Sequence, residues 1–150
     1  MYGDIANKLV QEAKRTKSLD TLPLFKDDYV KDIIRETVDL QQEAEILAAQ
    51  QDDIDIESNR VKNCQLFITH LCMRRNKRCL LAYQKLRASK LDQLAWEDCD
   101  PSRNLFDNLS HHEQEYFRKY SEIIADYKGP LTDVDLSGSL EPPSDIFIDV

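Results

Sequence analysis

Apolar residues recur three or four positions apart along most of this 150-residue chain, the spacing of an α-helix with one buried face. Such stretches span residues 4–17, 26–51, 59–97 and 110–128. The chain contains only three glycines, too few for a fold rich in β-hairpins. The sequence therefore predicts an all-α fold with about four main helices, one of them much longer than the others.

Short local signals mark where several of these helices begin and end. Asp4 is a candidate N-cap of the first helix. Ser110 and Glu113 have the spacing of a capping box, in which each side chain accepts a hydrogen bond from the other residue's backbone N–H. Gly129, followed by Pro130, is predicted to end the last helix as a C-terminal glycine cap.

The same periodicity predicts which side of each helix is buried. Residues 19–25, between the first two helices, are mainly apolar and are expected to pack rather than extend into solvent. On the second helix the predicted stripe consists of Val30, Ile33, Ile34, Val38 or its neighbour Leu40, Ala44, Leu47 and Ala48. On the fourth it consists of Tyr116, Phe117, Tyr120, Ile123, Ile124 and Tyr127.

The long helix at 59–97 differs from the rest of the chain in charge. The whole chain carries a net charge of -8, yet residues 59–91 contain nine Lys or Arg and no Asp or Glu. One face is predicted to hold Val61, Cys64, Ile68, Leu71, Cys72, Cys79, Ala82 and Leu86, with Arg75 near its middle. Other apolar residues surround the cylinder: Phe67, Met73, Leu80, Leu81, Tyr83 and Leu91. A helix this apolar needs more cover than the other helices supply, so a second polypeptide is expected against it.

The basic run Arg74, Arg75, Asn76, Lys77 and Arg78 has three interpretations. It resembles a basic region or a nuclear import signal, because clustered Lys and Arg neutralise phosphates. It also fits a solvated basic face whose aliphatic stems cover apolar surface. In the third interpretation, Arg75, with Arg78 and Asn76, enters a protein interface and pairs with carboxylates. On that view Arg75→Ala should damage assembly more than Lys77→Ala.

The sequence does not predict an enzyme, a metal site or a cofactor. His70, His111 and His112 have no Ser or Cys in a recognisable nucleophile motif, and there is no Gly-rich phosphate loop. His111 and His112 are expected about 100° apart on the first turn of a helix. Residues 50–58 resemble an acidic calcium loop but lack its glycine, so a solvated loop is predicted.

Compartment and cysteine chemistry follow from composition. No run approaches the roughly 18 apolar residues of a membrane span, and charges interrupt the N-terminus where a secretory signal needs an apolar core. An intracellular protein without membrane contact is expected. Cys64, Cys72, Cys79 and Cys99 include no C-x-x-C pair and are interpreted as small buried apolar residues rather than metal ligands.

Four segments resemble one known family, the Psf-one family of subunits of the GINS DNA replication complex. They are MYGDIANKLVQEAKRTK at 1–17, CMRRNKRCLLAYQKLR at 72–87, NLSHHEQEYFRKY at 108–120 and DVDLSGSLEPPSDIFIDV at 133–150. The resemblance implies an elongated helical bundle, the GINS A domain, over residues 1–130. It implies a linker and the first residues of a β-rich B domain over 131–150, where 146–150 has the residue types of a β-strand.

The resemblance also implies a function. The chain would be a nuclear, non-catalytic subunit of a heterotetramer with Sld-five, Psf-two and Psf-three. Through that complex it would contact the MCM ring, Cdc forty-five and the leading-strand DNA polymerase in the replicative helicase. Six positions match the family's assembly core: Arg74, Arg75, Asn76, Arg78, Leu81 and Tyr83. The apolar stripes add Ile68, Leu71, Phe117 and Tyr120 as interface candidates. The alternative is a helical protein that binds DNA through its basic central helix.

Overall fold

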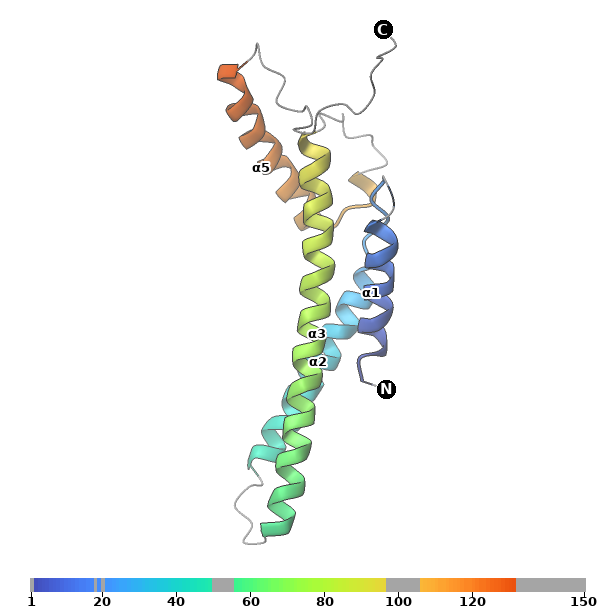
Figure 1. The fold of residues 1–150 in the computed structure, drawn as a ribbon, viewed down its shortest axis with the longest axis vertical. Coiled ribbons are helices and arrows are strands. Elements are labelled where there is room, and N and C mark those ends of the chain that lie inside the picture. Colours follow the sequence, from blue (N-terminus) through green and yellow to red (C-terminus); the bar gives the residue numbers. More distant parts are fainter. Residues whose placement is uncertain (1, 18, 20, 50–55, 97–105, 132–150) are drawn as a thin grey trace, which may run out of the picture.

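The computed structural model describes residues 2–17, 19, 21–49, 56–96 and 106–131. Its described part contains four long α-helices and no strand: α1 (Asp4–Lys17), α2 (Asp27–Ala49), α3 (Ile56–Trp96) and α5 (His111–Lys128). A short 3-10 helix, η1 (Gly129–Leu131), follows α5. The predicted all-α fold with one dominant helix is confirmed. Helix α3, 41 residues long, extends about 60 Å and forms the long axis of the bundle in Figure 1, with α5 reaching beyond its upper end.

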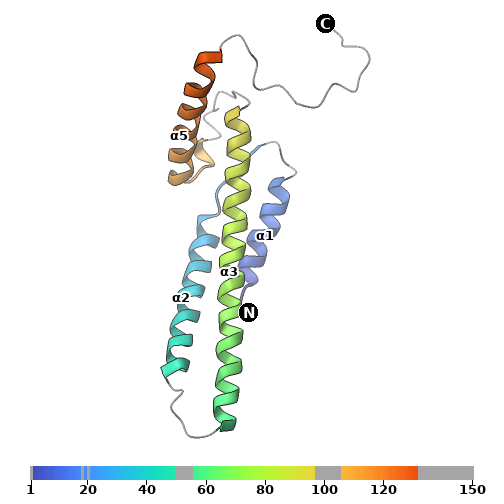
Figure 2. The same ribbon diagram turned by 60° about the vertical axis from the view of Figure 1, so that its left-hand side comes forward.

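Helices α1 and α2 pack against the lower and middle parts of α3 (Figure 2). Their shared core contains Ala6, Leu9 and Ala13 from α1, Ile33 from α2 and Tyr83 from α3. Leu9 and Ile33 are fully buried, and burying such a side chain contributes about 1.5–3 kcal/mol relative to leaving it in water. This core fixes α1 and α2 on one side of α3.

A second core joins the C-terminal part of α3 to α5. It contains Leu91 and Ala95 from α3, Phe117 and Ile124 from α5, and Leu109 just before α5. Leu22, from the segment between α1 and α2, is also fully buried in it. That segment therefore packs as predicted, although its Leu19 and Leu24 remain exposed. Helix α5 lies against only one end of α3 and diverges from it in Figure 1.

The helix ends agree with the sequence in most respects. Ser110 Oγ accepts a hydrogen bond from Glu113 N at 3.3 Å, and Glu113 Oε2 accepts one from Ser110 N at 2.9 Å, so the capping box is confirmed. Helix α1 begins at Asp4 itself, after Gly3, whose φ of 84° is readily adopted only by glycine. The prediction of a glycine cap at Gly129 is wrong in conformation. Its φ of -50° is right-handed because the chain continues into η1.

Several residues predicted to be buried are exposed within this chain. On α2 the buried residues are Ile33 and Leu40, whereas Ile34, Val38 and Ala48 are exposed. The stripe was predicted too wide, because α1 and α3 cover only one side of α2. Of the stripe predicted on α5, Phe117 and Ile124 are buried, whereas Tyr116, Ile123 and Tyr127 are exposed, since α3 is the helix that covers α5.

The cysteines follow the same trend. Cys64 is exposed, and Cys72 and Cys79 are partly buried; all three are free thiols. The interpretation of Cys64 as a buried residue is wrong, because none of the helices described here lies over its side of α3. Cys99, residues 50–55 of the acidic loop and residues 132–150, with the predicted strand at 146–150, lie outside the described residues. No helix in the described part combines the length and apolar character that crossing a membrane requires.

Candidate subunit interface

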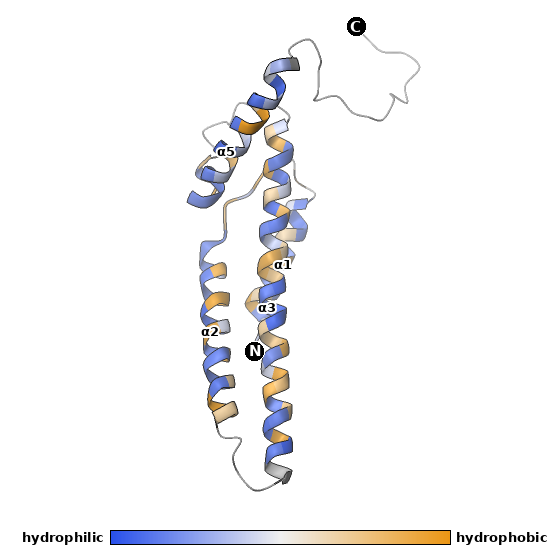
Figure 3. Ribbon diagram, turned by 90° about the vertical axis from the view of Figure 1, so that its left-hand side faces the viewer, coloured by the Kyte–Doolittle hydropathy of each residue, from blue (hydrophilic) through white to orange (hydrophobic). Residues whose placement is uncertain are grey.

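Helix α3 has one side that faces the other helices of the chain and one that faces solvent. The inward side carries a row of buried residues that is more polar than the pattern predicted: Thr69, Asn76, Tyr83, Arg87, Leu91 and Ala95. The face predicted to be buried, centred on Arg75, points largely outward; Val61, Cys64, Ile68, Leu71, Arg75 and Ala82 are all exposed. Figure 3 shows apolar and hydrophilic residues intermixed along α3.

Arg87 is the buried charge of this chain that the sequence analysis missed. Its side chain is 1% exposed and pairs with Glu113 of α5 through two hydrogen bonds: Arg87 Nε donates to Oε1 at 2.6 Å and Nη2 to Oε2 at 3.0 Å. Such a bidentate pair combines charge with fixed geometry. Glu113 is also the capping-box glutamate, so one carboxylate starts α5 and anchors it to α3.

The Arg87 guanidinium also donates hydrogen bonds to backbone carbonyls of two other segments, one before α2 and one before α5. Nη1 donates to the Pro23 carbonyl at 2.8 Å, and Nη2 donates to the Asn108 carbonyl at 3.2 Å. The Asn108 carbonyl also accepts from Phe25 N, and the Asn108 side chain donates to the Leu22 carbonyl. The pair therefore joins three segments: the stretch before α2, the C-terminal half of α3 and the start of α5.

Two aromatic rings complete the surroundings of Arg87. Its guanidinium carbon lies 5.3 Å from the centroid of the Phe25 ring and 5.7 Å from that of Tyr83, within the range of a cation–π contact. The Tyr83 hydroxyl accepts a hydrogen bond from Lys26 N at 3.1 Å, and burial raises the pKa of this phenol above 10. A sequence signal existed, because Arg87 follows Tyr83 by four residues and precedes Leu91 by four, on one face.

Asn76 is also buried between helices of this chain and forms a hydrogen bond to another helix. It is 1% exposed, and its Nδ2 donates to Glu36 Oε1 of α2 at 3.3 Å. The same Glu36 oxygen accepts from Gly3 N, just before α1, at 2.7 Å. The Asn76 Oδ1 atom has no hydrogen-bond partner among the described residues. Asn76 thus joins α1, α2 and α3 from within the chain and presents no surface to a partner.

The outward side of α3 carries several large apolar side chains in solvent. Phe67 is 65% exposed and Leu81 is 60% exposed; Val61, Ile68 and Leu71 are also exposed. Single exposed apolar residues are ordinary, but a series along one side of one helix is typical of a surface that another protein covers.

Four cations lie among these apolar residues. Arg74, Arg75, Lys77 and Arg78 are all exposed, and none forms an ion pair with a carboxylate in the described part of the chain. A shallow hollow on α3 alone is lined by Leu71, Arg74, Arg75, Lys77, Arg78 and Leu81. The three arginines therefore share this surface depression with Leu71 and Leu81.

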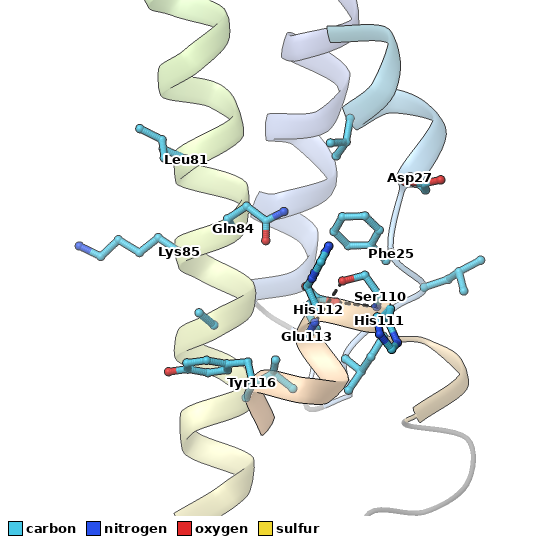
Figure 4. Close-up of a pocket in the computed structure, with 15 residues that line it drawn as sticks. Phe25, Asp27, Leu81, Gln84, Lys85, Ser110, His111, His112, Glu113 and Tyr116 are labelled. Atoms are coloured by element: carbon cyan, nitrogen blue, oxygen red, sulfur yellow. Dashed lines mark hydrogen bonds between the residues drawn. The ribbon is translucent and has the colours of Figure 1, made fainter. Parts of the chain in front are cut away.

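An open groove of about 910 Å³ continues this surface toward α5. Leu81 and Lys85 of α3 lie on one side of it, and Phe25, His111 and His112 lie on the other (Figure 4). His111 and His112 lie in the first turn of α5, as predicted, with ring centroids 6.0 Å apart. Nowhere in the described ranges are three or more His, Cys, Asp or Glu side chains grouped as a metal ion would require.

The ten predicted interface residues thus fall into two groups. Six are exposed on the outward side of α3: Ile68, Leu71, Arg74, Arg75, Arg78 and Leu81. Asn76, Tyr83 and Phe117 are buried between helices of this chain, and Tyr120 is partly buried against Trp96, whose indole N–H donates to its hydroxyl at 3.1 Å. These four side chains pack inside the chain rather than on its outward surface. Helical periodicity predicted them as interface residues because it indicates that a side chain is covered without identifying what covers it.

Comparison with known proteins gives consistent matches. The family model described as the GINS complex protein helical bundle domain, Sld5, matches residues 24–132. The chain is 43% identical to the DNA replication complex GINS protein PSF1 of Debaryomyces hansenii, in an alignment covering 100% of this chain and 82% of that relative. It is 40% identical to the protein of the same name from Candida albicans, covering 100% and 81%. For the one from Yarrowia lipolytica the identity is 45%, with coverage of 100% and 77%.

Proposed function

The chain belongs to the PSF1 family of GINS complex proteins, and we propose that it is a non-catalytic subunit whose outward α3 face contacts another subunit of that complex. Its role in DNA replication is structural, and its partners are other GINS subunits. The observation that carries the proposal is the row of large apolar residues in solvent along α3, with Phe67 and Leu81 each at least 60% exposed. Covering such a side chain contributes about 1.5–3 kcal/mol.

The finer assignments extend this proposal. The partner subunits are Sld-five, Psf-two and Psf-three, and through them the chain reaches the MCM ring, Cdc forty-five and the leading-strand polymerase in the nucleus. Residues 1–130 form the helical assembly domain, and 131–150 lead from it toward a β-rich domain.

Co-expression tests the proposal directly. The chain expressed alone should aggregate as its concentration is raised and remain monomeric only when dilute, because none of its described segments covers the outward side of α3. Co-expression with the other three subunits should give one soluble complex with one copy of each, measured by native mass spectrometry. A stable, soluble monomer that does not bind the other subunits would contradict the proposal.

A matched pair of variants locates the contact on α3. Phe67→Ser combined with Leu71→Ser should lower the yield of the complex, because it removes apolar area from the outward side. Gln65→Ser is the control, an exposed position on nearly the opposite side of the same helix. Equal yields from both variants would place the contact elsewhere.

Exposure of the basic run is the one observation that favours DNA binding, and a titration separates the two functions. The chain alone should bind labelled duplex and forked DNA weakly at two salt concentrations. Tight binding with a steep dependence on salt would favour the nucleic-acid function instead.

A further inference from the structure

The outward side of α3 has the spacing of a helix that packs along another helix. Six exposed residues follow one another at alternating intervals of four and three: Phe67, Leu71, Arg74, Arg78, Leu81 and Lys85. Side chains at these intervals lie along one line on a helix and face a single neighbouring helix over several turns. We call these six residues the outer stripe.

The outer stripe has one apolar end, a basic centre and a mixed end. Phe67 and Leu71 form the apolar end, and Leu81 and Lys85 form the mixed end. Between them stand Arg74 and Arg78, which form no ion pair with any described carboxylate. Residues 59–91 contain no Asp or Glu, so this stretch of α3 supplies no carboxylate of its own.

We propose that the outer stripe docks an amphipathic acidic helix of another GINS subunit, with apolar residues facing Phe67, Leu71 and Leu81 and carboxylates facing Arg74 and Arg78. The proposal rests on the proposed function, since it specifies the chemistry of one subunit contact within the assembly. It assigns to the partner helix a pattern complementary to the first five residues of the stripe, Phe67 to Leu81: apolar, acidic, apolar.

Charge complementarity favours an acidic helix as the partner of the outer stripe. A covered guanidinium needs a paired anion, because its uncompensated burial is strongly unfavourable. Carboxylates on a helix meet that need, since the arginine fork binds a carboxylate through two parallel hydrogen bonds. Arg75 lines the same hollow beside the stripe and can supply a further donor to the same helix.

A second copy of the chain does not fit the stripe through the same face. In an antiparallel pair centred on the stripe, Arg74 of one copy meets Arg78 of the other, and in a parallel pair each arginine meets itself. Both arrangements place like charges together. A nucleic acid fits less well than a helix, because phosphates gain nothing from Phe67 and Leu81, which would remain exposed to solvent.

The groove beside α5 extends the surface available to such a helix. Leu81 and Lys85 belong both to the outer stripe and to the wall of this groove. In Figure 4 both side chains project from α3 toward the side away from Phe25. A helix lying on the stripe therefore runs along the α3 edge of the groove, whose lining also includes Tyr116 of α5.

Charge reversal in the co-expressed four-subunit complex tests the proposal. Arg74→Glu with Arg78→Glu should weaken incorporation of this chain at least tenfold, about 1.4 kcal/mol. Lys8→Glu with Lys14→Glu, at exposed positions of α1, makes the same change in net charge and should leave incorporation unchanged. Circular dichroism of each variant checks that helix content is retained, which is expected because all four positions are exposed.

The partner helix can then be identified. A photo-crosslinking residue in place of Leu71 should attach to an acidic helix of another subunit, and Asp or Glu→Lys changes there should restore incorporation of the doubly reversed chain. Four outcomes would overturn the proposal: equal incorporation of both reversed variants, crosslinking to a segment without carboxylates, crosslinking to a second copy of this chain, or salt-dependent binding of forked DNA that only the Arg74→Glu, Arg78→Glu variant loses. Failure of the unaltered chain to assemble would contradict the proposed function itself, and this outcome is distinguishable from the four that overturn the proposal about the outer stripe.

Discussion

Arg75 and Arg87 are the same residue type on the same helix, yet the fold uses them in opposite ways. Arg87 is 1% exposed and bound by the Glu113 carboxylate, two backbone carbonyls and two aromatic rings. Arg75 is exposed and has no carboxylate partner among the described residues. Twelve residues at 100° each place the two side chains about 120° apart, so one faces α5 and the other faces solvent.

The difference shows that α3 has two polar surfaces with different purposes. The inner one, with Asn76 and Arg87, forms hydrogen bonds to Glu36 and Glu113 within the chain and fixes how α1, α2 and α5 sit on α3. The outer one, with Arg74, Arg75 and Arg78, has no carboxylate partner within the ranges that the structure describes. Breaking an inner contact should therefore damage the fold, whereas breaking an outer one should damage only assembly.

The largest effect is expected at Glu113. Glu113→Ala leaves the Arg87 guanidinium buried without its anion and should lower the free energy of unfolding by about 3–5 kcal/mol. Urea unfolding of the dilute chain, followed by fluorescence of Trp96, measures this. Trp96 is the only tryptophan and contacts α5 through the Tyr120 hydroxyl.

Two further variants separate the ion pair from the helix cap. Ser110→Ala removes the cap but keeps the pair, and should cost about 1 kcal/mol. Arg87→Met combined with Glu113→Leu removes both charges together, and should cost much less than Glu113→Ala, because no unpaired charge remains. If the double variant were the least stable, burial of the unpaired charge would not be the cause.

The sequence predicted where the helices lie along the chain better than it predicted which side of each helix is buried. The helix bounds, the capping box of Ser110 and Glu113, and the excess of apolar surface on α3 all follow from local pattern. The local pattern does not predict which side of α3 faces the other helices. The helix is apolar on several sides, and periodicity alone does not indicate which of them is buried. Ile68 and Leu71 look more like core residues than Asn76 and Arg87, yet the latter two are buried, since their partners Glu36 and Glu113 lie 40 and 26 residues away.

Asn76 is expected to show an intermediate effect. Asn76→Ala removes its hydrogen bond to Glu36 and leaves a small void, at a cost of about 1–2 kcal/mol by urea unfolding. The cost is limited because Glu36 keeps the hydrogen bond from Gly3 N. Asn76→Asp should cost more than Asn76→Ala, since it places a second carboxylate beside Glu36. Equal stability of the two variants would argue against a close contact with Glu36.

Tyr116 offers a smaller effect that depends on pH. Its hydroxyl donates to Asp92 Oδ1 at 2.7 Å, and this hydrogen bond, with burial, raises the pKa of Tyr116 to about 12. The unfolded chain has the ordinary value near 10. Because the folded value is higher, the stabilisation is complete below pH 10 and is lost as pH rises through about 12. Tyr116 is largely exposed, so Tyr116→Phe should cost only about 0.5 kcal/mol at neutral pH.

Tyrosinate absorbance during an alkaline titration checks this assignment. Unaltered chain should show a component near pH 12 that Tyr116→Phe removes. Asp92→Asn should shift that component toward 10, because the carboxylate is the largest cause of the raised pKa. A titration unchanged by both substitutions would exclude the hydrogen bond. Tyr83, whose pKa burial also raises, remains in both variants and serves as an internal reference.

The smallest effect on stability is expected at Arg75 itself. Arg75→Ala removes an exposed side chain without a carboxylate partner, so unfolding of the dilute chain should change by no more than about 0.5 kcal/mol. The same change should reduce incorporation into the co-expressed complex more than Lys77→Ala does. Both side chains line the hollow on α3, but only the arginine fork binds a carboxylate through two parallel hydrogen bonds. A large loss of stability with Arg75→Ala would mean that this side chain supports the fold as Arg87 does, and the division of α3 into an inner and an outer polar surface would then be wrong.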